Sequence, residues 1–533
     1  MDAPLLNFNR HREDIEREVV DRAVDWFAKA AGRDPLRSYQ LVLNDAALNE
    51  IHRLQRNRPR SSSPLESWER LARQLGRMTE PELEREVRKQ TARYVNDVAG
   101  HFDHRVYRFA TSALPTGLGA LFKTTDLIQG LTTLRELESR IRVEGEIERV
   151  RELAQYGTLV IVPTHSSNLD SIVMGWSIHN AGLPPCTYGA GKNLFSNPLV
   201  GFFMRNLGAY RVDRRLRHML YKDVLKFYSQ VLIERGYHSL FFPGGTRSRS
   251  GEIERRLKLG LVGSAISAFA ERIQKDDRRP IYIVPVTINY PLVLEAETLV
   301  EDHLKEAGQA RYIIDDDEFA HVSKGSHFVA RIMGLDTTMV IRYGNPLDVF
   351  GNPVGPDGRS RGPNGTTLDA HRYFLRDGEM TVDAQRDTEY TRQTGAAVAQ
   401  AYLRESVILP THFLGWLLFQ RERRLAPHLD LFALLRSTSG HRHDLTELCD
   451  DAERVRRLLC RLEGRGELKL YPSVRNQPID EVVSDAVRTF GMYHLKSAVE
   501  PSDTALVVGD PKMLYFYGNR LAPWSNALEE GMA

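Results

Sequence analysis

Cysteine is scarce in this chain, which has three cysteines among its 533 residues. Cys186, Cys449 and Cys460 are too few and too far apart for a disulfide framework or a zinc site, which fits a reducing cytosol. Net charge is nearly absent as well, because 72 basic residues stand against 70 acidic ones. This balance excludes a protein that covers a polyanion with its whole surface, and we expect no nucleic-acid partner.

Long apolar runs are also missing. No segment approaches the roughly 18 uninterrupted apolar residues of a membrane span, and the N-terminus lacks the apolar core of a signal peptide. The first residues instead predict an amphipathic helix, whose apolar stripe is formed by Ile15, Val19, Val20, Ala23 and Phe27. We therefore expect no transmembrane span, and any contact with a membrane to be peripheral, on its cytoplasmic face.

The patterns along the chain divide it into three regions. Residues 1–134 have helical patterns, apart from a loop at 57–67, and residues 391–533 have mainly helical ones. Between them, residues 135–390 alternate helical stretches with short apolar runs, at 158–163, 186–191, 208–213, 238–243, 281–288 and 338–344. This alternation predicts an α/β fold with a central sheet covered by helices. A Gly/Pro-rich stretch at 350–367 predicts a long loop.

The stretch "TLVIVPTHSSNLDS" (158–171) carries the strongest chemical signal. A buried strand ends at Pro163, and His165 and Asp170 follow it just before an apolar helix. On a helix, this spacing would put the two side chains about 140° apart, so they meet only if the intervening residues turn. An imidazole held by a carboxylate is the basic half of a Ser-His-Asp arrangement, without the serine. The nucleophile would then be a hydroxyl group of the substrate.

Two structural interpretations compete with this one. Ser167 and Asp170 match a capping box at a helix N-terminus, which would make both residues purely structural. The same spacing also recurs at His218 and Asp223, where a helical pattern places His218 on the polar, solvated side. The catalytic interpretation of His165 gains support from its position after a strand, because open α/β sheets bind ligands at that edge.

The stretch "FFPGGTRSRSG" (241–251) joins the end of an apolar run to two glycines and two arginines. Glycines let main-chain N–H groups converge on one point, and arginine forks bind polyoxygen anions bidentately. The two arginines stand two residues apart, so in an extended segment they point to the same side. The stretch therefore predicts a phosphate site. Its candidate ligands are Gly244, Gly245, Thr246, Arg247, Ser248 and Arg249.

Further blocks follow these motifs in a fixed order. They are "AGKNLFSNPLVGFFMRNLGAYRVDRR" (190–215), "YKDVLKFYSQVLIERGYHSLFFPGGTRSRSGE" (221–252) and "IVPVTINYPLVLE" (283–295). Together with the His165 loop they resemble the glycerolipid acyltransferases, and specifically the branch that acylates glycerol 3-phosphate or dihydroxyacetone phosphate. The stretches "MVIRYGNPLDV" and "LYFYGNRLAP" look like that branch too, so the resemblance covers about residues 130–524.

The resemblance implies roles for individual residues. His165 would be the general base and Asp170 its orienter. Arg211 and Arg214, together with the two arginines of the 241–251 stretch, would surround the phosphate of the acceptor. The resemblance implies no metal and no cofactor, because acyl-CoA or acyl carrier protein brings the acyl group as a co-substrate.

Two further candidates have equally good structural interpretations. Pro285, in the "VPV" of Val284–Val286, would line the path of the acyl chain, although a plain buried strand explains the same residues. Lys192 could reach the phosphates of the thioester carrier, or it is an ordinary surface lysine.

Position 244 departs from the family pattern. Relatives typically carry a glutamate ahead of Gly-Thr-Arg-Ser, where this chain has Gly244. The loss of a carboxylate leaves the loop more positive and more pliable, which affects the positioning of the glycerol more than phosphate binding. Glu252 and Asp213 are candidates to replace it. The loss also raises the alternative of a non-catalytic lipid-binding protein, against which the intact His165 argues.

The expected function is transfer of a fatty acyl group from a thioester to the primary hydroxyl of glycerol 3-phosphate, as in phospholipid synthesis. Main-chain N–H groups near Gly244 and Gly245 would stabilise the oxyanion. Dihydroxyacetone phosphate and lysophosphatidate remain alternative acceptors, because the same pocket would hold any of these phosphates. The stretch "GAYRVDR" (208–214) is closer to the lysophosphatidate type.

Two surfaces complete the expectations. Residues 194–215, apolar and basic, are the candidate for docking on an anionic membrane surface, unless Phe202, Phe203 and Met204 are simply core. Residues 445–470 resemble a winged-helix module, in which acidic residues interleave with basic ones and argue against DNA binding.

Overall fold

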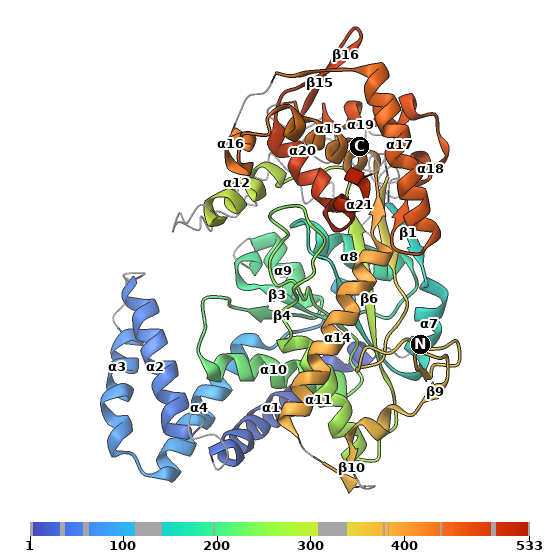
Figure 1. The fold of residues 1–533 in the computed structure, drawn as a ribbon. Helices are drawn as coiled ribbons and strands as arrows, with labels where there is room; N and C mark the ends of the chain where they lie inside the picture. Colours follow the sequence, from blue (N-terminus) through green and yellow to red (C-terminus); the bar gives the residue numbers. More distant parts are fainter. Residues whose placement is uncertain are drawn as a thin grey trace.

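The computed structural model describes residues 4–31, 38–56, 63–111, 141–195, 198–307, 338–376, 379–381, 383–436, 440–491 and 497–530. A central sheet lies between N-terminal helices on one side and a mainly helical C-terminal region on the other (Figure 1). The long helix α14 (Ala384–Glu405) runs from one end of the sheet toward the C-terminal region. The predicted α/β class is confirmed.

Within the described residues, the central sheet has seven strands in the order β1-β7-β6-β2-β5-β3-β4. Their bounds are β1 Ile141–Gly145, β2 Thr158–Pro163, β3 Thr187–Gly191, β4 Ala209–Val212, β5 Ser239–Leu240, β6 Ile281–Asn289 and β7 Met339–Tyr343. Neighbouring strands pair in parallel except β6 and β7, which are antiparallel. Each of the six predicted apolar runs contains one of these strands.

The centre of the sheet is fully buried. Every residue of β2 and β6 is inaccessible to solvent, which explains why both read as continuous apolar runs rather than as alternating patterns. β1 differs, because Arg142 and Glu144 alternate with its apolar residues and only Ile141 is buried. The sequence patterns did not predict this strand.

Helices cover the sheet. They are α7 Ile147–Tyr156, α8 Asp170–Asn180, α9 Pro198–Asn206, α10 Met219–Glu234, α11 Gly260–Gln274 and α12 Ala296–Ala307, with the 3-10 helix η4 Lys192–Phe195. α10 packs on α11, and α11 packs on α14, which also contacts β6. The helices thereby fix the loops that follow the strands, where the candidate site residues lie.

The N-terminal region is helical, as predicted. Its elements are η1 Pro4–Asn7, α1 Phe8–Ala31, α2 Tyr39–Arg56, α3 Ser63–Gln74, η3 Leu75–Arg77 and α4 Glu80–Val98. All five residues of the predicted apolar stripe of α1 are buried. The loop predicted at 57–67 is wrong in its second half, because α3 begins at Ser63; residues 57–62 lie outside the described residues.

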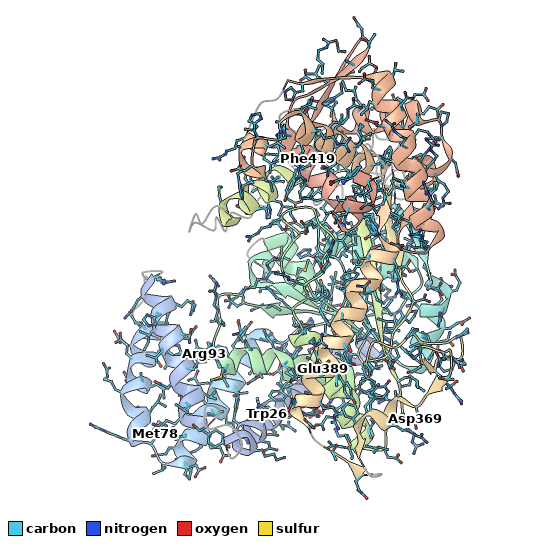
Figure 2. All side chains as sticks on the ribbon, in the orientation of Figure 1. Trp26, Met78, Arg93, Asp369, Glu389 and Phe419 are labelled. Carbon is cyan, nitrogen blue, oxygen red and sulfur yellow. The ribbon has the colours of Figure 1, made fainter. Side chains whose placement is uncertain are left out.

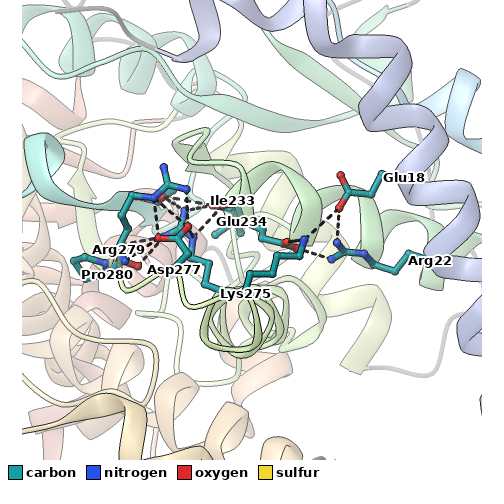
Figure 3. Close-up of polar contacts among 10 residues, drawn as sticks. Glu18, Arg22, Ile233, Glu234, Lys275, Asp277, Arg279 and Pro280 are labelled. Carbon is teal, nitrogen blue, oxygen red and sulfur yellow. Dashed lines mark hydrogen bonds and ion pairs between the residues drawn. The ribbon is translucent and has the colours of Figure 1, made fainter. Parts of the chain in front are cut away.

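Ion pairs fasten the N-terminal helices to the sheet domain. Arg22 of α1 donates to Glu234 of α10 at 2.6 Å, and Lys275 contacts the other oxygen of Glu234 at 2.5 Å (Figure 3). Beside them, Trp26 packs against Phe227 with ring centroids 6.2 Å apart (Figure 2). α1 therefore forms part of the scaffold around α10.

The C-terminal region is mainly helical, and α15 is its buried centre. Its elements are β12 Val407–Ile408, α15 Pro410–Leu425, α16 Leu431–Arg436, β13 Arg442–Asp444, α17 Leu445–Gly464, β14 Lys469–Leu470, α18 Pro472–Asn476, α19 Ile479–Phe490, β15 Val499–Ser502, β16 Ala505–Val508, α20 Pro511–Gly518, η7 Asn519–Trp524 and α21 Ser525–Glu530. α15 packs on α19 and α20, and Phe419 meets Tyr515 edge-on (Figure 2). The antiparallel sheet β13-β16-β15 lies beside α17 and α19. Residues 445–470, for which a winged-helix module is predicted, form the single helix α17 and the strand β14, and the module stays a prediction.

The loop predicted at 350–367 is mostly irregular and contains a short antiparallel pair, β8 Ser360–Arg361 and β9 Thr367–Leu368. Before α14 come the 3-10 helix η6 Ala370–Phe374 and the pair β10 Leu375–Arg376 and β11 Glu379–Met380.

The division into three regions stays a prediction. Residue 134 lies outside the described residues, and residue 390 falls inside α14. One hydrophobic cluster extends from Ile141 to Leu528, so the sheet and the C-terminal region share a core. Among the helices of the described ranges, none combines the length and the apolar character that a bilayer crossing requires.

Candidate active site

The connection between β2 and α8 brings His165 and Asp170 together. Residues 164–169 turn sharply after the strand, so Nδ1 of His165 lies 2.8 Å from Oδ2 of Asp170. This hydrogen bond fixes the tautomer and the direction of the ring, and it makes Nε2 the nitrogen that can accept a proton. The spacing of the two residues in the sequence therefore has the geometry that a base and its orienter need.

The carboxylate of Asp170 is completely buried and fully engaged. Besides the imidazole, Oδ2 accepts the main-chain N–H groups of Ser166 and Ser167 at 2.6 and 2.9 Å. Oδ1 accepts the hydroxyl of Tyr290 at 2.6 Å, and burial together with Asp170 raises the pKa of Tyr290 well above its ordinary value. A buried charge needs such partners, since an unpaired one costs several kcal/mol or more.

Ser167 and Asp170 do not form the capping box that the sequence allows. α8 begins at Asp170, and its N-cap, Leu169, makes no side-chain capping bond. The hydroxyl of Ser167 donates to Oε2 of Glu295 at 3.0 Å instead. Asp170 does hold the N–H of Ser167, but the same oxygen also holds His165, so the helix start and the His–Asp contact share one carboxylate.

The 241–251 loop packs against His165 on two sides. The ring of Phe242 stacks on the imidazole, with centroids 4.5 Å apart and planes 28° from parallel. The N–H of Ser248 donates to the carbonyl of His165 at 2.8 Å, and the N–H of His165 donates to Oε1 of Glu254 at 2.9 Å. The imidazole itself is 13% exposed. The two predicted motifs thus form one site at the end of β2 and β5.

A larger residue is disfavoured at each of the two glycines of the loop, for different reasons. Gly245 has a φ of +72°, and a Cβ there would lie 2.5 Å from the side chain of Lys258. Gly244 has an ordinary φ, but a Cβ there would lie 2.6 Å from the carboxyl group of Glu254. The N–H of Gly245 donates to the carbonyl of Phe242 at 3.0 Å, so this predicted oxyanion donor already has a partner within the loop.

Arg247 lies beside the His–Asp loop. Its Nη1 is 3.3 Å from Oε1 of Glu295, which also accepts the N–H of Asn168 at 2.8 Å. Glu295 is buried, and that burial raises its pKa. The guanidinium of Arg247 is a quarter exposed, so one side is held by Glu295 while the other can meet a ligand.

The other loop residues vary in their surroundings. Thr246 is exposed, and the hydroxyl of Ser248 donates to the carbonyl of Glu252 at 2.8 Å. Arg249 follows in the same loop and is partly buried. Glu252, a predicted replacement for a carboxylate at position 244, is exposed; the carboxyl group that contacts Gly244 belongs to Glu254.

The arginines after β4 separate into two environments. Arg211 lies 3.4 Å from Asp97 of α4, with its guanidinium over the ring of Phe195. Arg214 instead is exposed and lies near Lys258, the residue that covers Gly245; burial, and then the charge of Arg214, lower the pKa of Lys258. The sequence did not single out Lys258.

Lys192 and Asp213 belong to the environment of Arg211. Lys192 lies 3.0 Å from Asp97 and 3.5 Å from Asp213, which also accepts Arg215 at 2.9 Å. Asp213 is therefore engaged in these ion pairs and does not take the place of a carboxylate at position 244. Arg215 is exposed and forms its ion pair with this buried acid.

Pro285 lies inside the fully buried strand β6. It is paired with Val162 of β2, and its carbonyl accepts the N–H of Gly344. Val284 and Val286 belong to the hydrophobic core. A role in the acyl path stays a prediction for these residues.

The C-terminal region closes the back of the site. Arg520 is buried and donates to the carbonyl of Ile288 at 3.0 Å, and burial lowers its pKa to about 10. Asn519 donates to the carbonyl of Ser250 at 2.7 Å. A pocket behind the His–Asp pair is lined by Ser166, Ser248, Gly251, Tyr290, Val293, His412, Phe516, Tyr517 and Arg520. Residues from the sheet region and from the C-terminal region therefore share one cavity.

The prediction that His218 is solvated is wrong. It is buried at the N-cap of α10, where Nδ1 accepts the N–H of Tyr221 at 3.2 Å, and burial lowers its pKa to about 4. Its ring lies 5.2 Å from that of Tyr94 in α4. The N-terminal helices cover the polar side of α10, which the sequence pattern left open to solvent.

The region that carries this site is similar to known proteins. Residues 140–289 match the family model described as Acyltransferase. A glycerol-3-phosphate acyltransferase of Pseudomonas aeruginosa is 31% identical over 207 residues, which are 39% of this chain and 22% of that protein. The glycerol-3-phosphate acyltransferase of Histophilus somni is 35% identical over 157 residues, 29% of this chain and 19% of that protein.

The protein of the same name from Actinobacillus pleuropneumoniae serotype 5b is 30% identical over 218 residues, 40% of this chain and 24% of that protein. The chain thus spans about a fifth to a quarter of the length of these relatives. The matched residues include β1 to β6, the His165–Asp170 loop and the 241–251 loop. Residues 140–289 are therefore similar to an acyltransferase domain, and in this part the chain resembles glycerol-3-phosphate acyltransferases.

Proposed function

We propose that the protein transfers a fatty acyl group from a thioester to the primary hydroxyl of glycerol 3-phosphate. The observation that carries the proposal is the contact between the two motifs: at one sheet edge, the main-chain N–H of Ser248 in the arginine-bearing loop donates to the carbonyl of His165, which is paired with Asp170. A base and an anion site so close together suit an acceptor that carries a hydroxyl and a phosphate.

The reaction uses His165 as a general base. Nε2 takes the proton of the acceptor hydroxyl while the oxygen attacks the thioester carbonyl, and Asp170 stabilises the imidazolium that forms. The tetrahedral intermediate collapses to an ester, the carbon–sulfur bond breaks, and the thiol leaves with the proton from His165. The acyl group passes directly to the acceptor, so this mechanism has no covalent enzyme intermediate.

The phosphate of the acceptor binds at the 241–251 loop. Arg247, Arg249 and Arg214 supply guanidinium groups, and Lys258 adds an amine over Gly245. Charge-assisted hydrogen bonds from such groups are about twice as strong as neutral ones. Arg211, paired with Asp97, lies in the neighbouring ion-pair group and contributes through the local positive charge.

The acyl donor is acyl-CoA or acyl carrier protein. Its chain enters beside β6, where Pro285 and the neighbouring valines offer an apolar wall. No residue assigned here requires a metal or a cofactor for the transfer.

A membrane surface takes up the product. Phe202 on α9 is 49% exposed and Phe109 is 61% exposed. Phe203 stacks on Phe109 and meets Phe202 edge-on, and Arg205 on the same helix is exposed. Met204 is buried, so the alternative that these three residues are core holds for Met204 alone. An apolar and basic surface of this kind suits a peripheral contact with anionic headgroups on the cytoplasmic face.

Nucleic acid is not an expected partner of the winged-helix-like module. α19 presents Asp480 and Glu481 to solvent, and its apolar face is buried against α15. Acidic groups on an exposed helix repel a phosphate backbone.

A direct assay tests the function. The purified chain is incubated with labelled glycerol 3-phosphate and either palmitoyl-CoA or palmitoyl-acyl carrier protein, and with dihydroxyacetone phosphate or lysophosphatidate as competing acceptors. We expect lysophosphatidate as the product, with glycerol 3-phosphate as the preferred acceptor. A preference for another acceptor would correct the substrate, and no transfer to any of the three would overturn the proposal.

A further inference from the structure

Glu254 places its carboxyl group directly over Gly244. A Cβ atom added to Gly244 would lie 2.6 Å from Cδ, Oε1 and Oε2 of Glu254. This separation is about that of two carbon–carbon bonds, as between the Cβ and Cδ atoms of one glutamate. The carboxyl group of residue 254 therefore occupies the space in which a glutamate at position 244 would place its own.

The course of the loop explains how residue 254 reaches position 244. The chain turns at Gly251, which has a φ of +80° and where a Cβ would collide with the main chain of Phe516. The N–H of Lys258 then donates to the carbonyl of Pro243 at 2.7 Å and closes the loop. Residues 252–258 thus fold back over the two glycines.

The carboxyl group is in contact with the base. Oε1 of Glu254 accepts the N–H of His165 at 2.9 Å, while Oε2 is sealed from solvent and has no hydrogen-bond partner among the described residues. Asp170 and Arg520 are the charged groups around it, with opposite effects on its ionisation. Glu254 thus fixes the main chain of His165 and leaves one oxygen beside the loop that holds the acceptor.

We propose that Glu254 is a positioning residue for His165 that substitutes, from ten residues further along the chain, for a glutamate side chain at position 244. The inference rests on the proposed function, because its effect is on acyl transfer. It explains why Gly244 is a glycine although its φ would accept any residue: the space for a side chain is already taken.

Exchanging the two residues tests the proposal. Gly244→Glu alone adds a second carboxyl group in the occupied space, and Glu254→Ala alone removes the only one there. We expect each single variant to lower kcat by about 10-fold or more, and Gly244→Glu combined with Glu254→Ala to return to within about threefold of the wild type. The KM for glycerol 3-phosphate should change little, because the effect passes through His165.

Glu252→Ala is the matched control. Glu252 is exposed, two residues away, and the substitution removes the same side chain. It should be active alone and should not rescue Gly244→Glu. A double exchange at 244 and 254 that is no better than Glu254→Ala would overturn the proposal, and so would an equal rescue by Glu252→Ala. Loss of acceptor affinity without loss of kcat would also overturn it, because Glu254 would then act on the acceptor.

If the exchange variants fold poorly, a smaller substitution at position 244 tests the same coupling. Gly244→Ala should impair the wild type but be tolerated in the Glu254→Ala background, because the carboxyl group that its Cβ would meet is gone; additive effects would contradict the proposal. Thermal unfolding of every variant separates loss of fold from loss of rate. An inactive wild type would refute the proposed function, whereas an active wild type without coupling between the two positions refutes this inference alone.

Discussion

Tyr290 donates a hydrogen bond of 2.6 Å to Oδ1 of Asp170, on the opposite side of the carboxylate from His165. The tyrosine directly follows β6, and Asp170 begins the helix that follows β2, so the pair connects the segments after the two central strands. Asp170 therefore keeps its orientation through contacts on both oxygens, and the direction of the imidazole depends on a residue outside the two sequence motifs.

Tyr290→Phe tests this relationship. The variant removes one hydrogen bond to a buried carboxylate, which is worth about 1.5–3 kcal/mol. We expect kcat to fall by about 10-fold with little change in the KM of either substrate, and the melting temperature to drop. Steady-state kinetics and thermal unfolding measure both. A lower melting temperature with an unchanged kcat would mean that Tyr290 serves the fold alone.

Arg247→Ala should weaken the binding of the acceptor. Charge-assisted hydrogen bonds worth about 1.5–3 kcal/mol would be lost, so the KM for glycerol 3-phosphate should rise by about 10- to 150-fold while the KM for the thioester stays nearly constant. Arg247→Lys should recover part of the loss, because it keeps the charge without the fork.

Arg255→Ala, at an exposed position in the same segment, is the control for Arg247. Thermal unfolding belongs with this experiment, because Arg247 also neutralises the buried Glu295. A rise in the thioester KM alone would assign the loop to the phosphates of the donor.

The pH dependence of stability should report on Glu254. Burial raises the pKa of Glu254 to about 8, against an ordinary value of 4.5; the hydrogen bond from His165 and the charge of Arg520 oppose the shift, and Asp170 adds to it. The folded state thus binds a proton that the unfolded state has lost between these pH values, so this group's contribution to stability is present below pH 4.5 and is lost as the pH rises toward 8.

Glu254→Gln removes that titration. The melting temperature of the wild type should fall, relative to that of the variant, between pH 5 and pH 9. Thermal unfolding at the two pH values measures the difference. A constant difference would show that Glu254 is ionised throughout this range.

Phe202→Ser should weaken membrane binding. The side chain is half exposed on α9, and burying such a ring in a bilayer is worth about 1.5–3 kcal/mol, so flotation with anionic liposomes should decrease by about 10- to 100-fold. Tyr156→Ser is the control, since Tyr156 on α7 is 68% exposed. If liposome binding does not change with the Phe202 substitution, with the anionic lipid content or with the salt concentration, this surface is not the membrane-binding site.

The sequence predicts the parts of this site that are continuous in the chain. The strand ends, the His165–Asp170 turn and the basic loop are each read from a local pattern, and the structure brings them together. β1 was missed because Arg142 and Glu144 interrupt its apolar residues. His218 was predicted to be solvated, but α4, which is distant in the sequence, packs against its ring.

Glu254 shows the same limit within the site. The sequence around Glu254 has no motif that predicts a contact with His165, because the contact depends on the turn at Gly251, which brings residue 254 back over Gly244. Tyr290, Glu295 and Arg520 lie in stretches that resemble the family, but their contacts with the site depend on β6 and on the C-terminal helices. Such contacts between distant segments require the folded structure.

The most direct test of the account is the acyl-transfer rate of His165→Ala against that of His179→Ala. His179 is exposed on α8, the same helix that Asp170 begins, so it controls for the loss of an imidazole nearby. With labelled glycerol 3-phosphate and palmitoyl-CoA, His165→Ala should lower kcat by 10²–10⁴-fold with an unchanged melting temperature, and His179→Ala should keep the wild-type rate. Equal rates for the wild type and His165→Ala would contradict the assignment of His165 as the base.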